Sequence, residues 1–348
     1  MSKVIIRADG SKDIGMGHLN RCALIANYLQ LTKNIGSVIV TINNPEAKSF
    51  IEKKLNKTEI FYIDDLSEHS GLSEIKDIVN TENISIIILD LLEHNLTNYY
   101  LNILKKNQLP IAAISDDSEY REIDVDLILN GNPNQEQFNY SRCMGKYLTG
   151  PSYFIMDPAY ANSIIHKKNK GTRVLVTLGG SDHNNLIFKV LPVLIDSSII
   201  SEVIIITSQS TGYLYKLKNI LNTLNGNIKL YSDVESLVTY WGICDVALTA
   251  GGNSLFERIA SGIPGATICQ LTRQMEIADK FEKIGVNKNI GFGPDLSNLD
   301  IKKVVNEFMN DKLEHASQIK KCRETVSGNG LRYFVDELCV LMGKNNGF

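Results

Sequence analysis

The stretch CDVALTAGGNSLFERIASGIPGATIC, residues 244–269, decides the fold class. It opens with a mostly apolar run at 244–248, turns on Gly251 and Gly252, continues as an amphipathic segment, and closes on a second apolar run at 265–269. Short apolar runs that alternate with helix-like segments are typical of parallel sheets covered by helices on both faces. The stretch therefore predicts a strand–helix–strand unit of an α/β fold.

The same alternation extends over most of the chain and restarts after a polar, basic stretch at 166–171. We predict an α/β protein with two Rossmann-like doubly wound domains, residues 1–165 and 172–325, and a ligand cleft between them. Residues 326–348 are expected to contain a last helix that packs on the first domain. Further strands are expected at residues 4–7, 37–42, 85–89, 110–114, 173–177 and 202–206.

The composition excludes several classes of protein. Hydrophobic residues make up 43% and charged residues 22% of 348 positions, which is ordinary for a globular chain and not for a disordered one. A net charge of -3 gives no basic field for nucleic acid. No run reaches the roughly 18 apolar residues of a membrane span, and no signal peptide is visible, so we expect a cytoplasmic protein.

Metal and cofactor sites are not expected. The six cysteines include no CxxC pair, and no HExxH, P-loop or suitable D-x-D motif is present. The cysteines are interpreted as small buried apolar residues. All histidines other than His18 are interpreted as surface residues: His69, His94, His166, His183 and His315.

The first glycine turn, ADGSKDIGMGHLNRC at residues 8–22, follows a strand and opens a helix. Gly15 and Gly17 permit a tight turn and a close approach of the backbone to a ligand. The motif is not GxGxxG, because Asn20 stands at the last glycine position, so an NAD site is not indicated. The carboxyl end of a strand is nevertheless where open α/β sheets bind ligands.

His18 falls in the first turn of that helix. The positive end of the helix dipole disfavours imidazolium, and a neutral imidazole is what a general base needs. We therefore predict that His18 is catalytic. The alternative is a histidine that only supports the turn or a domain contact.

The second glycine turn, at Gly251 and Gly252, is predicted to bind a diphosphate on the backbone N–H groups at the start of the next helix. Glu257, one helical turn further on, is placed to accept hydrogen bonds from ribose hydroxyls. The alternative is that Ser254 and Glu257 form a capping box, which needs no ligand. Gly179, Gly180, Ser181 and Asp182 follow the strand at 173–177. They either border the ligand cleft or the nucleotide pocket, or form a plain strand-to-helix turn.

Several segments together resemble the UDP-sugar hydrolases of bacterial pseudaminic acid synthesis and the related spore-coat polysaccharide proteins. They cover nearly the whole chain in the expected order. The matching segments are RADGSKDIGMGHLNRC (7–22), ISDDS (114–118), DLILNGN (126–132), YLTGPSYFIMDPAY (147–160), VLVTLGGSDHNN (174–185) and DVALTAGGNSLFERIASGIP (245–264).

The resemblance implies the two-domain glycosyltransferase-B (GT-B) fold and hydrolysis of UDP-2,4-diacetamido-2,4,6-trideoxy-β-L-altropyranose to UDP and free sugar. It implies that His18 activates the attacking water and that the small-molecule UDP-sugar is the partner. The implied sugar-binding residues are Gly17, Arg21, Asp90, Arg273 and Gln274. The implied UDP-binding residues are Gly180, Ser181, Gly251, Gly252, Asn253, Ser254 and Glu257.

Two positions depart from the family pattern. Arg273 stands where the family has asparagine, and Leu92 stands where it has tyrosine. An arginine brings a fixed charge and a fork of donors that asparagine lacks. These differences motivate a second hypothesis, a glycosyltransferase in which His18 deprotonates an acceptor hydroxyl. A third is a protein of polysaccharide assembly that binds the nucleotide-sugar without turnover.

Overall fold

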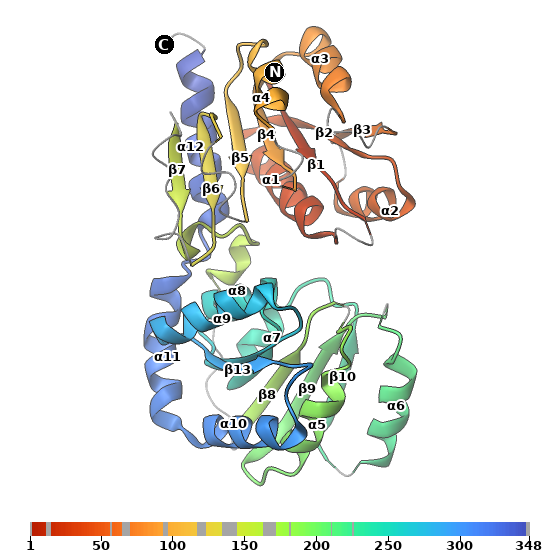
Figure 1. Cartoon of the computed structure of the whole chain (residues 1–348), viewed down its shortest axis with the longest axis vertical. Coiled ribbons are helices and arrows are strands. Elements are labelled where there is room, and N and C mark those ends of the chain that lie inside the picture. Colours follow the sequence, from red (N-terminus) through yellow and green to blue (C-terminus); the bar gives the residue numbers. More distant parts are fainter. Residues whose placement is uncertain are drawn as a thin grey trace. The chain divides into compact units, whose positions relative to one another are not determined.

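The computed structural model contains two compact α/β units (Figure 1). Unit 1 comprises residues 1–157 and 329–348, and unit 2 comprises residues 158–328. Each unit is a parallel sheet with helices interleaved along the chain, so the prediction of two doubly wound α/β domains is confirmed. The structure describes residues 2–11, 15–55, 58–64, 70–92, 97–116, 123–133, 145–162, 172–180, 182–209, 211–224 and 226–345.

Unit 1 is built on a seven-stranded sheet of order β3-β2-β1-β4-β5-β6-β7. The strand order reverses between β1 and β4, so the loops after these two strands lie at the topological switch point. The strands are β1 (Lys3–Ala8), β2 (Gly36–Ile42), β3 (Glu59–Ile63), β4 (Ile84–Asp90), β5 (Ile111–Ile114), β6 (Leu127–Asn130) and β7 (Lys146–Thr149). The helices are α1 (Gly17–Lys33), α2 (Pro45–Lys54), α3 (Leu72–Thr81), α4 (Asn98–Lys105) and α12 (Gly330–Asn345), with a 3-10 turn at Pro151–Tyr153.

Side-chain alternation along β4 separates the two faces of this sheet. Ile86 and Ile88 pack into the core under α1 and α12, whereas Ile87 and Leu89 pack into the core that contains residues of α3 and α4. Successive side chains of a strand point to opposite faces, so the next residue, Asp90, belongs to the α1 face.

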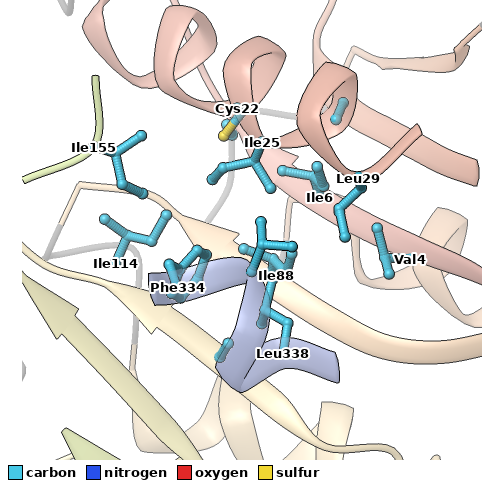
Figure 2. Packing of buried hydrophobic residues seen from close by; sticks show 14 of the residues in the cluster. Val4, Ile6, Cys22, Ile25, Leu29, Ile88, Ile114, Ile155, Phe334 and Leu338 are labelled. Carbon is cyan, nitrogen blue, oxygen red and sulfur yellow. The ribbon is translucent and has the colours of Figure 1, made fainter. Parts of the chain in front are cut away.

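Helix α12 closes the core of unit 1, although it lies more than 170 residues after β7. Phe334 and Leu338 lie among apolar side chains of α1 and the sheet, including Ile88 and Ile114 (Figure 2). On its outer side, α12 is joined to α1 by the Lys33–Asp336 ion pair, at 2.8 Å. Unit 1 is therefore completed by residues from both ends of the chain.

Unit 2 is built on a six-stranded sheet of order β10-β9-β8-β11-β12-β13, with its switch point between β8 and β11. One large apolar core packs on it, formed by α5, α10 and the facing strand residues. The strands are β8 (Thr172–Thr177), β9 (Ile200–Thr207), β10 (Ile228–Ser232), β11 (Val246–Thr249), β12 (Gly265–Cys269) and β13 (Lys288–Phe292). The helices are α5 (Ile187–Ile195), α6 (Leu214–Thr223), α7 (Val238–Ile243), α8 (Asn253–Ala260), α9 (Arg273–Ile284), α10 (Asn298–Asn310) and α11 (Lys312–Thr325), after a 3-10 turn at Pro158–Tyr160.

Two features differ from the sequence expectations. The strands at the sheet edges, β3, β7, β10 and β13, and the short β6 were not expected, because none carries a long apolar run. His315 is not a surface residue: it is buried and its ring packs on Phe308, with centroids 4.6 Å apart. The amphipathic helix α11 brings it inward. His183 is exposed as expected, whereas His69, His94 and His166 lie outside the described residues.

No helix within the described residues is both long enough and apolar enough to cross a membrane.

Candidate functional site

A buried carboxylate ends β4. Asp90 follows Ile86 and Ile88 on the α1 face of the sheet and is completely buried. A carboxylate in this position needs partners, because burying an unpaired charge is very costly. All of its described partners come from one helix, α1.

The partners are His18, Arg21 and Cys22, which are spaced i, i+3 and i+4 along α1 and therefore share one helix face. The same face continues inward as Ile25 and Leu29, which pack in the core (Figure 2). The apolar stripe that docks α1 on the sheet thus also aims its first turn at the end of β4. The packing of α1 on the sheet, and not the conformation of a loop, therefore positions these three polar side chains at Asp90.

His18 and Asp90 form a dyad. The His18 Nδ1 atom lies 2.7 Å from Asp90 Oδ1. An ionised carboxylate only accepts hydrogen bonds, so Nδ1 carries the proton and donates it. The neutral ring then has its lone pair on Nε2, which has no hydrogen-bond partner within the described part of the chain. An imidazole oriented in this way, with its lone pair on Nε2, is equipped to accept a proton.

Arg21 holds the same carboxylate in a fork. Its Nε donates to Asp90 Oδ2 at 2.8 Å and its Nη2 donates to Asp90 Oδ1 at 2.6 Å. The thiol of Cys22 completes the set, with Sγ 3.6 Å from Oδ2. Every described side chain that reaches Asp90 is a donor, so the ionised carboxylate is the form that the site stabilises.

The charges of this cluster act on each other's pKa values. Burial by itself raises the pKa of Asp90, but the charge of Arg21 and the hydrogen bonds from His18 and Arg21 outweigh it and lower the pKa to about 2. Burial lowers the pKa of His18, but the hydrogen bond and charge of Asp90 outweigh it and raise the pKa above 6.5. The direction of this shift is opposite to the one expected from the helix dipole, because the adjacent carboxylate is the stronger influence.

The lowered pKa of Asp90 makes a prediction for acid stability. A group with a lowered folded-state pKa stabilises the fold above its unfolded pKa of 3.8, and this contribution is lost as the pH falls through about 2. The difference corresponds to about 2 kcal/mol. We expect Asp90→Asn to have a lower free energy of unfolding than wild type in urea at pH 5. At pH 2 the difference in free energy of unfolding between the two proteins should be smaller by about 2 kcal/mol.

The pKa of His18 is raised in the folded wild type, so His18 is protonated in both the folded and the unfolded wild-type chain over that pH range. The surface variant Asp336→Asn is the control and should show no comparable narrowing. If the difference in free energy of unfolding between Asp90→Asn and wild type stayed constant from pH 5 to pH 2, the fold would not stabilise the ionised form of Asp90.

Two predicted sugar ligands take a different role in the structure. Asp90 has no exposed surface, and the side chain of Arg21 is 13% exposed and faces two carboxylates. Neither is placed to be a main contact of a sugar, so both are better described as supports of His18. Gly17, by contrast, is exposed directly before His18, and a Cβ there would meet no protein atom.

The second glycine turn lies in unit 2, between β11 and α8. The N-cap of α8 is Gly252, and no side chain caps the helix, so the capping box of Ser254 with Glu257 does not form. The backbone N–H groups of Asn253 and Ser254 have no partner within the described residues. A helix start with free N–H groups favours an anion, through both hydrogen bonding and the helix dipole.

Gln274 lies against this turn. A Cβ on Gly251 would come within 2.7 Å of the Gln274 Cβ, and one on Gly252 would lie 3.8 Å from Gln274 Nε2. The side-chain oxygen of Gln274 accepts the backbone N–H of Gln270 at 2.8 Å. The structure therefore brings together Gly251, Gly252 and Gln274, although Gly251 is required by protein packing whether or not a ligand is bound.

The remaining predicted residues of unit 2 are less constrained. Arg273 is the exposed first residue of α9, next to the half-exposed Leu271. Gly180 is exposed, with open space where a Cβ would stand, and Ser181 lies outside the described residues. Glu257 is partly buried and accepts a hydrogen bond from the buried Tyr160, whose pKa is raised by burial and by that carboxylate.

Sequence reasoning placed Asp182 in a glycine turn but missed the buried polar network that it joins at the carboxyl ends of β8, β9 and β12. Asp182 is 2% exposed; it accepts the backbone N–H of Leu186 at 2.9 Å and the Tyr213 hydroxyl at 2.8 Å. Gln270 donates to the same carboxylate. Asp182 and Gln270 are 88 positions apart, so no local pattern joins them. Asp182 has a φ of 35°, and a polar residue that tolerates positive φ directly after a glycine turn is the one available signal.

No group of three or more His, Cys, Asp or Glu side chains that could hold a metal ion is present among the residues that the structure describes. The two candidate sites described above are the His18–Asp90 dyad in unit 1 and the helix start at Asn253 in unit 2.

Comparison with solved structures defines the class of fold. The chain matches MurG of Acinetobacter baumannii with a TM-score of 0.74, at 12% identity, over 97% of this chain and 99% of that one. It matches the calicheamicin glycosyltransferase CalG4 with a TM-score of 0.68, at 12% identity, over 98% of both chains. The chain thus has the GT-B fold of these glycosyltransferases.

Comparison with curated proteins gives more specific relatives. The chain is 23% identical over 335 residues to the spore coat polysaccharide biosynthesis protein SpsG of Bacillus subtilis, covering 94% of each. It is 24% identical over 293 residues to the UDP-2,4-diacetamido-2,4,6-trideoxy-β-L-altropyranose hydrolase of Campylobacter jejuni, covering 81% of this chain and 97% of the relative.

An uncharacterized protein of Methanocaldococcus jannaschii is 26% identical over 289 residues, which are 81% of this chain but only 58% of that longer protein. No protein-family model matches the chain.

Proposed function

We propose that this protein is an enzyme that acts on a UDP-activated sugar, and that it hydrolyses a UDP-2,4-diacetamido-2,4,6-trideoxy-β-L-altropyranose type of substrate to UDP and free sugar. The observation that carries the proposal is the His18–Asp90 dyad, with Nδ1 held at 2.7 Å by a buried carboxylate. The name of the Campylobacter jejuni relative supports the hydrolysis, and that of the Bacillus subtilis relative supports a role in polysaccharide synthesis.

In the proposed reaction, His18 acts as the general base. Its Nε2 takes a proton from a water molecule, and the water oxygen forms a bond to C1 of the sugar. The bond between C1 and the phosphate oxygen breaks, and UDP leaves with the electron pair of that bond. Asp90 keeps the proton on Nδ1 and stabilises the imidazolium that forms.

Unit 2 is proposed to hold the nucleotide. The free N–H groups of Asn253 and Ser254 would bind the diphosphate and stabilise the charge that develops on it as it leaves. Glu257, oriented by the Tyr160 hydroxyl, would accept hydrogen bonds from the ribose. Gly180, Gly251 and Gly252 would leave room for the close approach of the nucleotide, and Gln274 and Arg273 would face the sugar.

The experiment that tests the proposal is incubation of the full chain with the UDP-diacetamido-trideoxy-altrose, without any acceptor, while UDP and free sugar are followed by NMR. We expect both products to appear in equal amounts. A parallel incubation with UDP-N-acetylglucosamine tests for selectivity. If no UDP is released from either nucleotide-sugar, with or without added glycan acceptors, the proposed function is wrong.

A glycosyltransferase is the second candidate. Leu92 is partly buried and lies two residues after Asp90, and its side chain offers no hydroxyl group to a sugar. Arg273 adds an exposed positive charge in unit 2. In this reaction His18 would deprotonate an acceptor hydroxyl in place of water. Release of UDP only when an acceptor is present would favour the transferase, and tight binding without turnover would favour a binding protein.

A further inference from the structure

Arg21 has almost no hydrogen-bonding capacity left for a ligand. A guanidinium has five N–H groups. Two of those in Arg21 are taken by Asp90, as described above, and two more by Asp116, through Nη1 to Oδ1 at 2.7 Å and Nη2 to Oδ2 at 3.0 Å. The side chain of Arg21 therefore lies between two carboxylates and clamps both of them.

Asp116 is the outer end of this arrangement. It follows β5, and its side chain is 50% exposed, whereas Asp90 at the inner end has no exposed surface. The Asn132 side chain donates to the backbone oxygen of Asp116 and so fixes that turn to the end of β6. The row of side chains thus comes from α1, from the end of β4 and from the turn after β5, and Asn132 after β6 supports its outer end.

The row has charges of alternating sign when His18 is protonated: His18, Asp90, Arg21, Asp116. The other described titratable groups around it are Cys22 on α1 and, further away, Asp9, which directly follows β1. Cys22 stays neutral, because burial and the charge of Asp90 raise the pKa of its thiol far above the ordinary range. Asp9 is engaged by its own buried partner, Arg7, at 2.9 Å on the opposite face of the sheet.

We propose that Arg21 and Asp116 are positioning residues that set the proton affinity of His18 through Asp90, and that they are not ligands of the sugar. Arg21 competes with His18 for the charge of Asp90 and lies only 3.3 Å from Nδ1, so it weakens the pull of Asp90 on the imidazolium. Asp116 neutralises part of the charge of Arg21 and so works in the opposite direction. This balance keeps His18 a usable base beside a buried carboxylate.

The proposal deepens the proposed function, because it concerns the group that acts as the base, but its test needs no substrate. The titration of His18 is followed by NMR of the ring protons in the full chain, with the His18 signal identified by its loss in His18→Gln. Arg21→Gln is expected to move the titration midpoint to higher pH, because the competing positive charge is gone. Asp116→Asn is expected to move it to lower pH.

The controls separate charge from structure. Arg21→Lys keeps the charge and loses the fork, so its shift should be smaller than that of Arg21→Gln. Asp336→Asn removes an exposed, ion-paired aspartate of the same unit and should leave His18 unchanged. If Arg21→Gln does not fold, Asp116→Asn decides the question, because it alters a half-exposed side chain.

Shifts of opposite sign in Arg21→Gln and Asp116→Asn support the proposal. An unchanged midpoint in Asp116→Asn, or shifts of the same sign in both variants, overturns it. Failure of wild type to act on any UDP-sugar contradicts the proposed function and leaves this result standing, because the titration is measured on the free protein.

Discussion

Replacing His18 by glutamine is expected to slow UDP release by about 10²–10⁴-fold, the range that general-base catalysis contributes. Glutamine has a side-chain N–H₂ that can still donate to Asp90, so the buried carboxylate keeps a partner in place of the His18 bond of 2.7 Å. It has no group that accepts a proton at neutral pH. We therefore expect kcat to fall, while KM and thermal stability change little.

The measurement is the steady-state rate of UDP release by wild type and variant at saturating substrate. His183→Gln is the matched control, since His183 is an exposed histidine in unit 2, and it should keep full activity. If His18→Gln retained the wild-type kcat with an intact fold, His18 would not be the base and the proposed mechanism would be wrong.

Replacing Phe334 by alanine is expected to destabilise unit 1 by about 3–5 kcal/mol, the usual cost of a Phe-to-Ala change in a packed core. Phe334 is completely buried on α12 and lies beside Ile88 and Ile114 (Figure 2). Truncation removes the transfer free energy of the ring and leaves a cavity between helix and sheet. A loss of this size is a large part of the stability of a typical domain.

Urea unfolding followed by circular dichroism measures this effect. Val340→Ala is the control on the same helix: Val340 is 51% exposed, and its truncation should change the free energy of unfolding by no more than about 0.5 kcal/mol. Equal effects of the two substitutions would mean that α12 does not pack on unit 1 through Phe334.

The central strands were predictable because they are buried on both faces and therefore carry continuous apolar runs. β1, β4, β8 and β9 all show this pattern. Edge strands such as β7, with two exposed residues out of four, have one neighbour and need no such run. Their positions depend on the strands beside them, which a local pattern does not record.

The site was partly predictable. His18 was found because a glycine turn and a helix start are local features. The supporting role of Asp90 required two further facts: that Ile86, Ile88 and Asp90 share a face, and that α1 covers that face. The first can be read from strand periodicity, but the second is a matter of tertiary packing. For the same reason, Arg21 was correctly placed near His18 but was predicted to bind the sugar. In the structure its guanidinium instead binds two carboxylates.

The return of α12 to unit 1 has a consequence for biosynthesis. Domains generally fold as units, and the N-terminal one often folds first while the chain is still being made. Here the sheet of unit 1 is synthesised first, but Phe334 and Leu338, which cover part of its α1 face, emerge only after the whole of residues 158–328. Unit 2 is contiguous in sequence, so it can complete its core while part of the apolar α1 face of unit 1 is still uncovered. We therefore expect unit 2 to finish folding before unit 1 during synthesis.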